Sequence, residues 1–327
     1  MATTEQLLQA LQAVIDPNTG KDFVSTKTLK NLQVEGGDVA FDVELGYPAK
    51  SQIPGIRQAL IAAAKGVAGV SNVSANVTSK ITAHAAQRGV ALLPQVKNIV
   101  AVASGKGGVG KSTTAVNLAL ALAAEGAKVG LLDADIYGPS QPMMMGIEGR
   151  PESEDGQTME PLENYGVQVM SIGFLVNADE AMIWRGPMAT QALEQLLRQT
   201  NWKELDYLIV DMPPGTGDIQ LTLSQRVPMT GAVIVTTPQD IALLDAKKGV
   251  KMFEKVGVPI LGLVENMAVH VCTNCGHVEH IFGADGGKKM AAEYGMDYLG
   301  ALPLDMQIRL QADSGKPTVV YDPDGEV

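Results

Sequence analysis

One run of nine residues constrains the fold of this chain more than any other feature. The run reads Gly105-Lys106-Gly107-Gly108-Val109-Gly110-Lys111-Ser112-Thr113. It follows an apolar, strand-like stretch at 98–103 and precedes a helix-like stretch at 114–124 that is rich in alanine and leucine. Glycines let the backbone turn so that successive N–H groups point at phosphate oxygens, and the N-terminus of the next helix adds its positive dipole. The run therefore predicts a nucleotide-binding phosphate loop, in which Lys111 contacts the β- and γ-phosphates and Ser112 is a ligand of Mg²⁺.

Composition bounds the class of protein. The 327 residues carry a net charge of −11, and 46% of them are hydrophobic. Such a chain is long enough for two domains, and its negative charge disfavours attraction to nucleic acid or to anionic membranes. No apolar run approaches the length of a membrane span, and the first residues lack the basic region and apolar core of a signal peptide. We therefore expect a cytoplasmic protein that binds neither nucleic acid nor membranes.

The chain divides into three parts by its pattern. Residues 1–80 show a helix, two strands joined by a hairpin loop, a second helix and a last strand, which predicts a small α+β domain. Residues 81–97 have no clear period and are expected to be a linker. In residues 98–327 near-continuous apolar runs alternate with helix-like runs, which indicates a mostly parallel sheet flanked by helices. The expected strands of that sheet are 99–103, 129–133, 207–211, 232–236 and 260–265.

Two aspartates follow predicted strands of this sheet. Asp135 comes two residues after the strand that ends at Asp133, and Asp211 is the last residue of the strand at 207–211. Because the carboxyl ends of parallel strands border the ligand crevice, we expect both carboxylates at the nucleotide. Asp211 is the candidate for holding Mg²⁺ through water, and Asp135 is the candidate for orienting the attacking water. Taken alone, either aspartate could instead cap a strand end or a helix.

The extra lysine of the loop, Lys106, makes its form specific. The loop resembles the deviant Walker A loop of the MinD/ParA-like ATPases, in which this lysine reaches across a two-fold dimer to the partner's nucleotide. The resemblance implies a homodimer in which Lys106 joins Lys111 and Asp135 as catalytic residues, because a second cation neutralises charge that develops on the γ-phosphate. The class is specific for adenine, which implies ATP, and Asn266 matches its base-contacting asparagine. The alternative for Asn266 is an ordinary turn residue at a strand end.

Cys272 and Cys275 have the spacing at which two thiolates can hold one metal centre. In a reducing compartment such a pair favours metal binding or redox chemistry over a structural disulfide. A [4Fe–4S] cluster takes four thiolates, so a two-fold dimer would have to supply the second pair. Zinc is the rival, because His277 and His280 could complete a ligand set within one chain, although their spacing is tighter than in usual zinc motifs. A redox-active dithiol or an inert loop is the third alternative.

Further segments resemble the Mrp/ApbC-type iron–sulfur cluster carrier ATPases over about residues 95–320. These segments are Asp133–Ser140, Trp184–Met188, Asp211–Asp218, Thr237–Asp240 and the cysteine loop. The resemblance implies an ATPase that carries a labile [4Fe–4S] cluster on a dimer and delivers it to apo-proteins, with cluster scaffold proteins as further partners. Residues 1–80 more weakly resemble a MIP18-like domain. They lack the reactive cysteine of many free-standing members, which favours a docking role.

Two other functions stay open at this stage. A MinD- or ParA-like positioning ATPase needs a basic DNA-binding surface or an amphipathic membrane-binding tail, whereas the segment 317–327 is short and acidic. A zinc-stabilised, nucleotide-dependent regulator would follow if the Cys and His side chains held zinc. Members of the carrier family usually continue with a further helix beyond the position of Val327. We therefore expect either a shortened chain or a dispensable terminal helix.

Overall fold

The computed structural model describes residues 2–86, 89–176 and 186–325, which form two compact units. The first unit comprises Met1–Thr82 with Ala124–Ala127, and the second comprises Ala83–Ala123 with Lys128–Val327. None of the described helices is long and apolar enough to cross a membrane.

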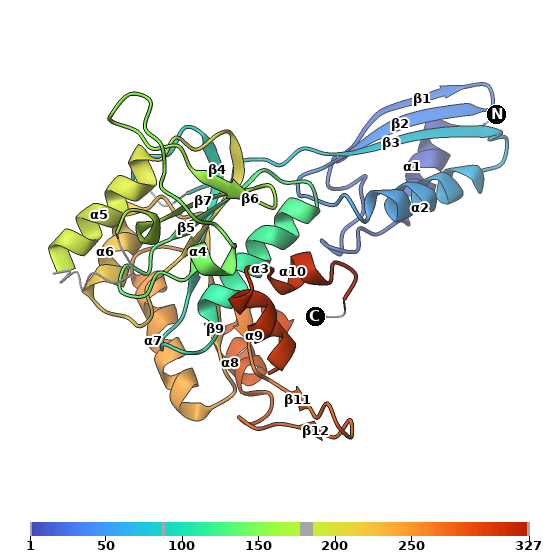
Figure 1. Cartoon of the computed structure of the whole chain (residues 1–327). Coiled ribbons are helices and arrows are strands. Elements are labelled where there is room, and N and C mark those ends of the chain that lie inside the picture. Colours follow the sequence, from blue (N-terminus) through green and yellow to red (C-terminus); the bar gives the residue numbers. More distant parts are fainter. Residues whose placement is uncertain (1, 87–88, 177–185, 326–327) are drawn as a thin grey trace. The chain divides into compact units, whose positions relative to one another are not determined.

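The first unit is a three-stranded sheet packed on two helices (Figure 1). Its central strand β2 pairs antiparallel with β1 and parallel with β3. Alternate residues of β2 are buried, as the period of two in a strand requires. The order of elements is the one that the sequence pattern predicts: α1 (Thr4–Gln12), β1 (Leu29–Glu35), β2 (Asp38–Leu45), α2 (Ile53–Lys65) and β3 (Asn72–Ser79).

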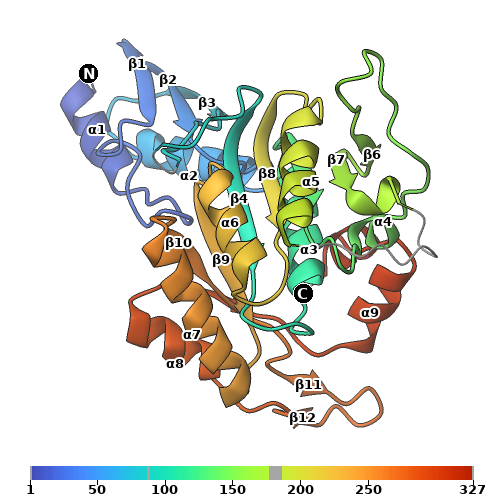
Figure 2. The ribbon, with the colours of Figure 1, turned by 90° about the vertical axis from the view of Figure 1, so that its left-hand side faces the viewer.

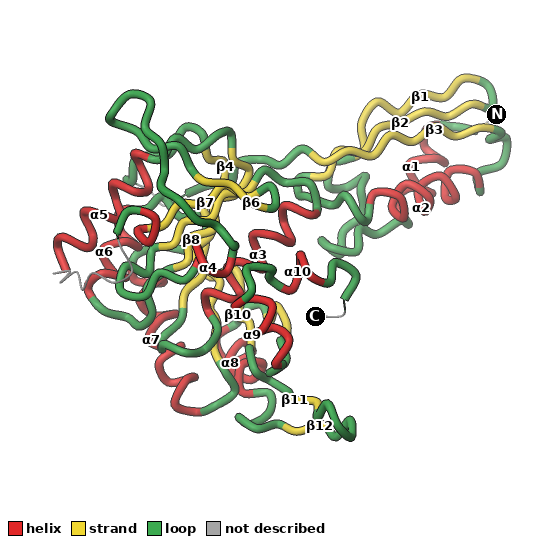
Figure 3. The backbone as a smooth tube through the Cα atoms, viewed as in Figure 1, coloured by secondary structure: helices red, strands yellow, loops and turns green. Residues whose placement is uncertain are grey.

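The second unit contains an eight-stranded sheet in the order β13-β10-β9-β4-β8-β5-β7-β6. Its strands run side by side (Figure 3), and all described pairs are parallel except the β6–β7 pair. Every residue of β5 and β9 is buried, which explains their unbroken apolar sequences and confirms the predicted mostly parallel sheet. The strands are β4 (Val96–Ala103), β5 (Val129–Asp133), β6 (Leu162–Asn164), β7 (Val167–Ser171), β8 (Leu205–Asp211), β9 (Gly231–Thr236), β10 (Ile260–Glu265) and β13 (Tyr298–Ala301).

Helices cover both faces of this sheet. α5, α6 and α7 lie on the face toward the viewer in Figure 2, and α3 lies on the other face. The carboxyl ends of β4, β5 and β8 are adjacent, because β8 pairs in parallel with both of the other strands. The helices are α3 (Lys111–Ala124), α4 (Gln141–Met144), α5 (Gly186–Gln199), α6 (Asp218–Arg226), α7 (Asp240–Lys255), α8 (Gly286–Tyr294), α9 (Met306–Asp313) and α10 (Thr318–Tyr321).

Candidate functional site

The glycine-rich run forms the connection between β4 and α3, the strand–loop–helix context that the sequence predicts. Gly108 and Gly110 have φ angles of +80° and +85°, the left-handed region that favours glycine. The Ser104 hydroxyl donates a hydrogen bond to the Lys106 carbonyl at 2.8 Å, and the Thr114 N–H donates to the Gly110 carbonyl at 3.0 Å. The loop thus leads directly into the first turn of a 14-residue helix.

Asn266 follows β10 and braces this loop. Its side-chain Nδ2 donates a hydrogen bond to the Val109 carbonyl at 2.9 Å, and the side chain is buried. Its backbone N–H donates to the Thr236 carbonyl at 2.8 Å, which fixes it to the end of β9. The structure therefore places Asn266 at the phosphate loop. Contact with an adenine base, which the resemblance to the MinD/ParA-like ATPases implies, stays a prediction.

Gly110→Ala is expected to lower the free energy of unfolding by about 2–3 kcal/mol and to weaken nucleotide binding. The reason is a clash as well as strain, because a Cβ on Gly110 would lie 2.0 Å from Asn266 Nδ2. Gly108→Ala is the matched control: it has the same sign of φ but no atom within 4 Å of its Cβ, so we expect about 1 kcal/mol. Chemical denaturation measures both. Equal losses in the two variants would contradict the clash with Asn266.

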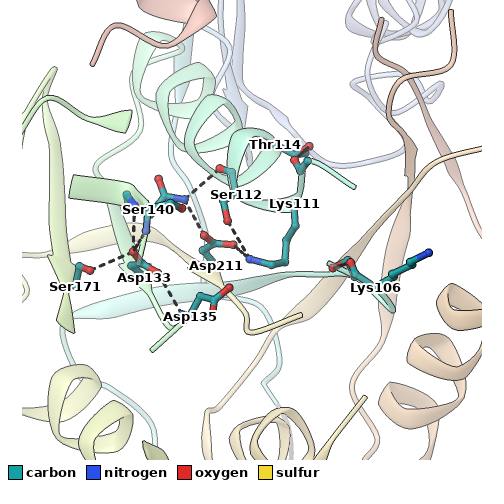
Figure 4. Close-up of polar contacts among 12 residues, drawn as sticks. Lys106, Lys111, Ser112, Thr114, Asp133, Asp135, Ser140, Ser171 and Asp211 are labelled. Atoms are coloured by element: carbon teal, nitrogen blue, oxygen red, sulfur yellow. Dashed lines mark hydrogen bonds and ion pairs between the residues drawn. The ribbon is translucent and has the colours of Figure 1, made fainter. Parts of the chain in front are cut away.

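Lys111 and Asp211 form a buried ion pair at the centre of the site (Figure 4); their side chains are 6% and 0% exposed. The Lys111 ammonium also donates to the Ser112 hydroxyl at 3.1 Å, so three of the predicted residues come together. The second carboxylate oxygen of Asp211 accepts a hydrogen bond from the Gln141 side chain at 2.8 Å. Asp211 is thus held on both oxygens, next to the hydroxyl that the sequence assigns to Mg²⁺.

Asp133, at the end of β5, is the second fully buried carboxylate. It accepts hydrogen bonds from the backbone N–H groups of Asp135, Ser140 and Gln141 and from the Ser171 hydroxyl, at 3.0–3.2 Å. Burial, followed by the charge of Asp211, raises the pKa of Asp133 to about 7. These bonds hold the backbone from 135 to 141 around the Asp133 carboxylate, so Asp133 fixes the shape of the segment that carries Asp135 and Gln141.

Asp135 is half-buried and lies near this cluster (Figure 4). Burial raises the pKa of its carboxyl, the charge of Lys111 lowers it, and the charge of Asp211 raises it. A carboxylate with a raised pKa is a stronger base. The surroundings of Asp135 therefore suit the predicted role of orienting a water.

Lys106 differs from Lys111 in its exposure and in the direction of its side chain. It is exposed, and its side chain points away from the Lys111–Asp211 pair (Figure 4). The two lysines of the loop thus face different directions. An exposed ammonium is available to a second molecule, whereas a buried one is not.

The two cysteines lie on a small hairpin after β10, made of β11 (His270–Val271) and β12 (Val278–Glu279). The Cys272 N–H donates to the His277 carbonyl at 2.9 Å, and the Gly276 N–H donates to the Cys272 carbonyl at 2.8 Å. Cys275 is exposed and Cys272 is partly exposed. Hydrogen bonds from the backbone N–H groups of Asn274 and Cys275, and then from the Cys275 thiol, lower the pKa of Cys272. A turn that stabilises a thiolate suits a metal ligand.

The structure does not bring the proposed zinc ligands together. Within residues 2–86, 89–176 and 186–325, no three His, Cys, Asp or Glu side chains are grouped so as to hold a metal ion. The ring of His280 instead lies with Nδ1 2.8 Å from the Ala268 carbonyl, and His277 lies 3.8 Å from Glu279. The hairpin thus presents its two thiols without a third such ligand grouped beside them among the described residues.

Three supporting residues were not found by sequence reasoning: Asp133, Gln141 and Ser171. The Asp133–Ser171 and Gln141–Asp211 hydrogen bonds span 38 and 70 residues, so no short motif connects those partners. Of the segment Trp184–Met188, Trp184 and Arg185 lie outside the described residues.

A glycine-rich loop at a helix N-terminus, a buried lysine, a hydroxyl and a strand-end carboxylate together fit a Mg²⁺–nucleotide. With the parallel sheet that carries them, they define a P-loop NTPase. Residues 95–327 match the family model described as "NUBPL iron-transfer P-loop NTPase", and residues 4–77 match the model "Iron-sulfur cluster assembly protein". The chain belongs to the NUBPL iron-transfer P-loop NTPase family, which confirms the resemblance inferred from its sequence.

Relatives of known name are similar over most of this chain. An "Iron-sulfur cluster carrier protein" of Pseudomonas fragi is 62% identical over 261 residues, which cover 79% of this chain and 91% of that protein. A protein of the same name from Haemophilus influenzae is 50% identical over 323 residues, 98% of this chain and 87% of that protein. The "Iron-sulfur cluster transfer protein NUBPL" of Mus musculus is 58% identical over 230 residues, 70% of this chain and 72% of that protein.

Solved structures agree with the fold. A nucleotide-binding protein from Archaeoglobus fulgidus in complex with ADP matches with a TM-score of 0.62 and 37% identity, covering 71% of this chain and 90% of that one. The cell division ATPase MinD of Pyrococcus furiosus matches with a TM-score of 0.53 and 22% identity, covering 70% and 92%. At that identity the likeness to MinD shows the fold alone.

Proposed function

We propose that this chain is an ATP-hydrolysing carrier that holds a labile [4Fe–4S] cluster as cargo between two copies of itself and delivers it to apo-proteins. The observation that carries the proposal is an exposed hairpin with two thiols on the same domain as a P-loop. The names of the relatives, iron–sulfur cluster carrier and iron–sulfur cluster transfer protein, support the cargo.

The nucleotide half of the proposal assigns one role to each residue. Loop residues 105–113 hold the phosphates of ATP, Asn266 lies against that loop where the base could be recognised, and Ser112 and Asp211 hold Mg²⁺. Mg²⁺, when bound, neutralises phosphate charge. An ATP phosphate competes with Asp211 for the Lys111 ammonium, because both are anions for the same cation. Asp135 orients the attacking water.

The cargo half of the proposal needs a dimer. Two thiolates per chain satisfy half of a [4Fe–4S] cluster, so Cys272 and Cys275 of two chains together complete it. The hairpin suits such a contact, because Val271 and Val278 pair with one another and are 50% and 54% exposed, and Ile281 is 53% exposed. Exposed apolar side chains beside a donor set favour burial against a partner.

The same proposal gives each part of the chain its own role. We propose a small domain over residues 1–80 that docks clients or cluster scaffold proteins, a linker over 81–97 and the ATPase over 98–327. The separate family matches at 4–77 and 95–327 support this division. We also propose that the protein is cytoplasmic and that its partners are other proteins. The net charge of −11 disfavours nucleic acid and anionic membranes as partners.

Anaerobic reconstitution of the wild-type chain with ferrous iron and sulfide tests this function. We expect about two irons per chain, or about four per dimer, with the visible absorption of a [4Fe–4S] cluster. Incubation with an apo-dehydratase that needs such a cluster should then restore its activity. Zinc at one per chain, or a bound cluster that no apo-protein accepts, would contradict a carrier.

A further inference from the structure

Gln141 is fully buried beside the phosphate loop, although it is not part of that loop. It is the first residue of α4 and is 0% exposed. Its side-chain Nε2 donates to Asp211 Oδ2 at 2.8 Å and to the Ser112 carbonyl at 3.1 Å, and its backbone N–H donates to Asp133 Oδ2 at 3.1 Å. One residue therefore connects the ends of β5 and β8 with the first turn of α3.

The bond to Asp211 fixes the plane of that carboxylate. Lys111 binds Oδ1, so without Gln141 the group could turn about its Cβ–Cγ bond, for which aspartate has broad rotational freedom. An amide donor restricts that rotation without adding a charge. A cation in the same place would compete with Mg²⁺ for the carboxylate, whereas an amide leaves the charge of Asp211 available.

The side-chain amide of Gln141 also lowers the free energy of unfolding through its oxygen atom. Among the described residues, Gln141 Oε1 is buried and has no hydrogen-bond partner. A buried acceptor without a partner disfavours folding, and an apolar side chain would avoid that cost. The gain from a glutamine here is therefore the direction that Nε2 imposes on Asp211 and on the Ser112 backbone.

We propose that Gln141 is a positioning residue for the Mg²⁺ side of the nucleotide site, which holds the Asp211 carboxylate in register with Ser112. The inference rests on the proposed assignment of Asp211 and Ser112 to Mg²⁺. Gln141 itself contacts neither metal nor phosphate in this role. It acts through the orientation of Asp211.

The test is the affinity of the full chain for a fluorescent ADP analogue, measured with Mg²⁺ and with EDTA in its place. For Gln141→Met we expect the gain in affinity from Mg²⁺ to fall about tenfold, because the lost hydrogen bond is to a charged group. Binding in EDTA should equal that of the wild type. Gln141→Leu, which also removes the donors and adds no charge, should lose as much and serves if the Met variant does not fold.

Gln168→Met is the matched control. Gln168 also makes two hydrogen bonds, to the carbonyl and N–H of Lys203, but contacts no carboxylate of the site. We expect wild-type affinity for this variant in both conditions. An equal loss for Gln141→Met with and without Mg²⁺, or no loss, would overturn the positioning role. A wild-type chain with no gain from Mg²⁺ would overturn the assignment of Asp211 and Ser112 as well, so the two failures are distinct.

Discussion

Lys106→Ala is expected to leave ATP binding close to that of the wild type and to lower the rate of ATP hydrolysis by about 10³-fold. The structure separates the two effects, because Lys111 lies in the buried centre of the site whereas Lys106 is exposed and points away from it. A cation that reaches a nucleotide from a second chain stabilises charge in the transition state without being needed for binding. Equilibrium binding and phosphate release measure the two properties on one preparation.

Mixing two inactive variants decides whether Lys106 acts on the partner's nucleotide. Lys106→Ala and Asp135→Ala should each be inactive alone. If Lys106 acts across the dimer, each mixed dimer has one site with both residues intact, so an equal mixture should recover about a quarter of the wild-type rate. No recovery would place Lys106 at the nucleotide of its own chain. Lys251→Ala, on the exposed face of α7, is the control and should leave the rate unchanged.

The fold could be predicted where the burial of an element produces a continuous apolar run in the sequence. β5 and β9 are apolar runs because both faces of the sheet are covered there, and they match the strands expected at 129–133 and 232–236. β6, β7 and β13 were not anticipated. β7 is a strand because it pairs with β5, 38 residues earlier at Val129 and Val167, and such a contact leaves no mark in a short window of sequence.

The site shows the same division between local and distant signals. The phosphate loop is contiguous, so its residues and their strand and helix flanks are visible in the sequence. The Lys111–Asp211 pair spans 100 residues, and the pair itself was not predicted; the sequence only placed both residues at the nucleotide, Lys111 through the phosphate loop and Asp211 through its strand end. No comparable rule predicts the position of Gln141 from the sequence, because that position depends on how the backbone from 135 to 141 wraps around Asp133.

Changing both Cys272 and Cys275 to serine is expected to abolish cluster binding while leaving ATP binding intact. Serine hydroxyls are poor ligands for iron compared with thiolates. The hairpin should keep its shape, because it is closed by backbone hydrogen bonds at Cys272 and not by the sulfur atoms. Iron and sulfide content after anaerobic reconstitution measures the loss. Thr273→Ala combined with Asn274→Ala changes the same turn but keeps both thiols, so this control should bind the cluster normally.

Mixed dimers of wild-type and double-serine chains, purified through two different affinity tags, separate a bridging cluster from one held within a single chain. A mixed dimer offers only the two thiolates of its wild-type chain, so a cluster that needs about four ligands should be absent. About half of the wild-type iron would instead show that each chain binds its metal alone, which would remove the reason for a dimer at the hairpin. It would leave the trans action of Lys106 as a separate question, because the lysine mixture tests that action by hydrolysis and without a cluster. Loss of cluster from the mixed dimer, with recovery of hydrolysis in the lysine mixture, would place both chemistries on the same two-fold assembly.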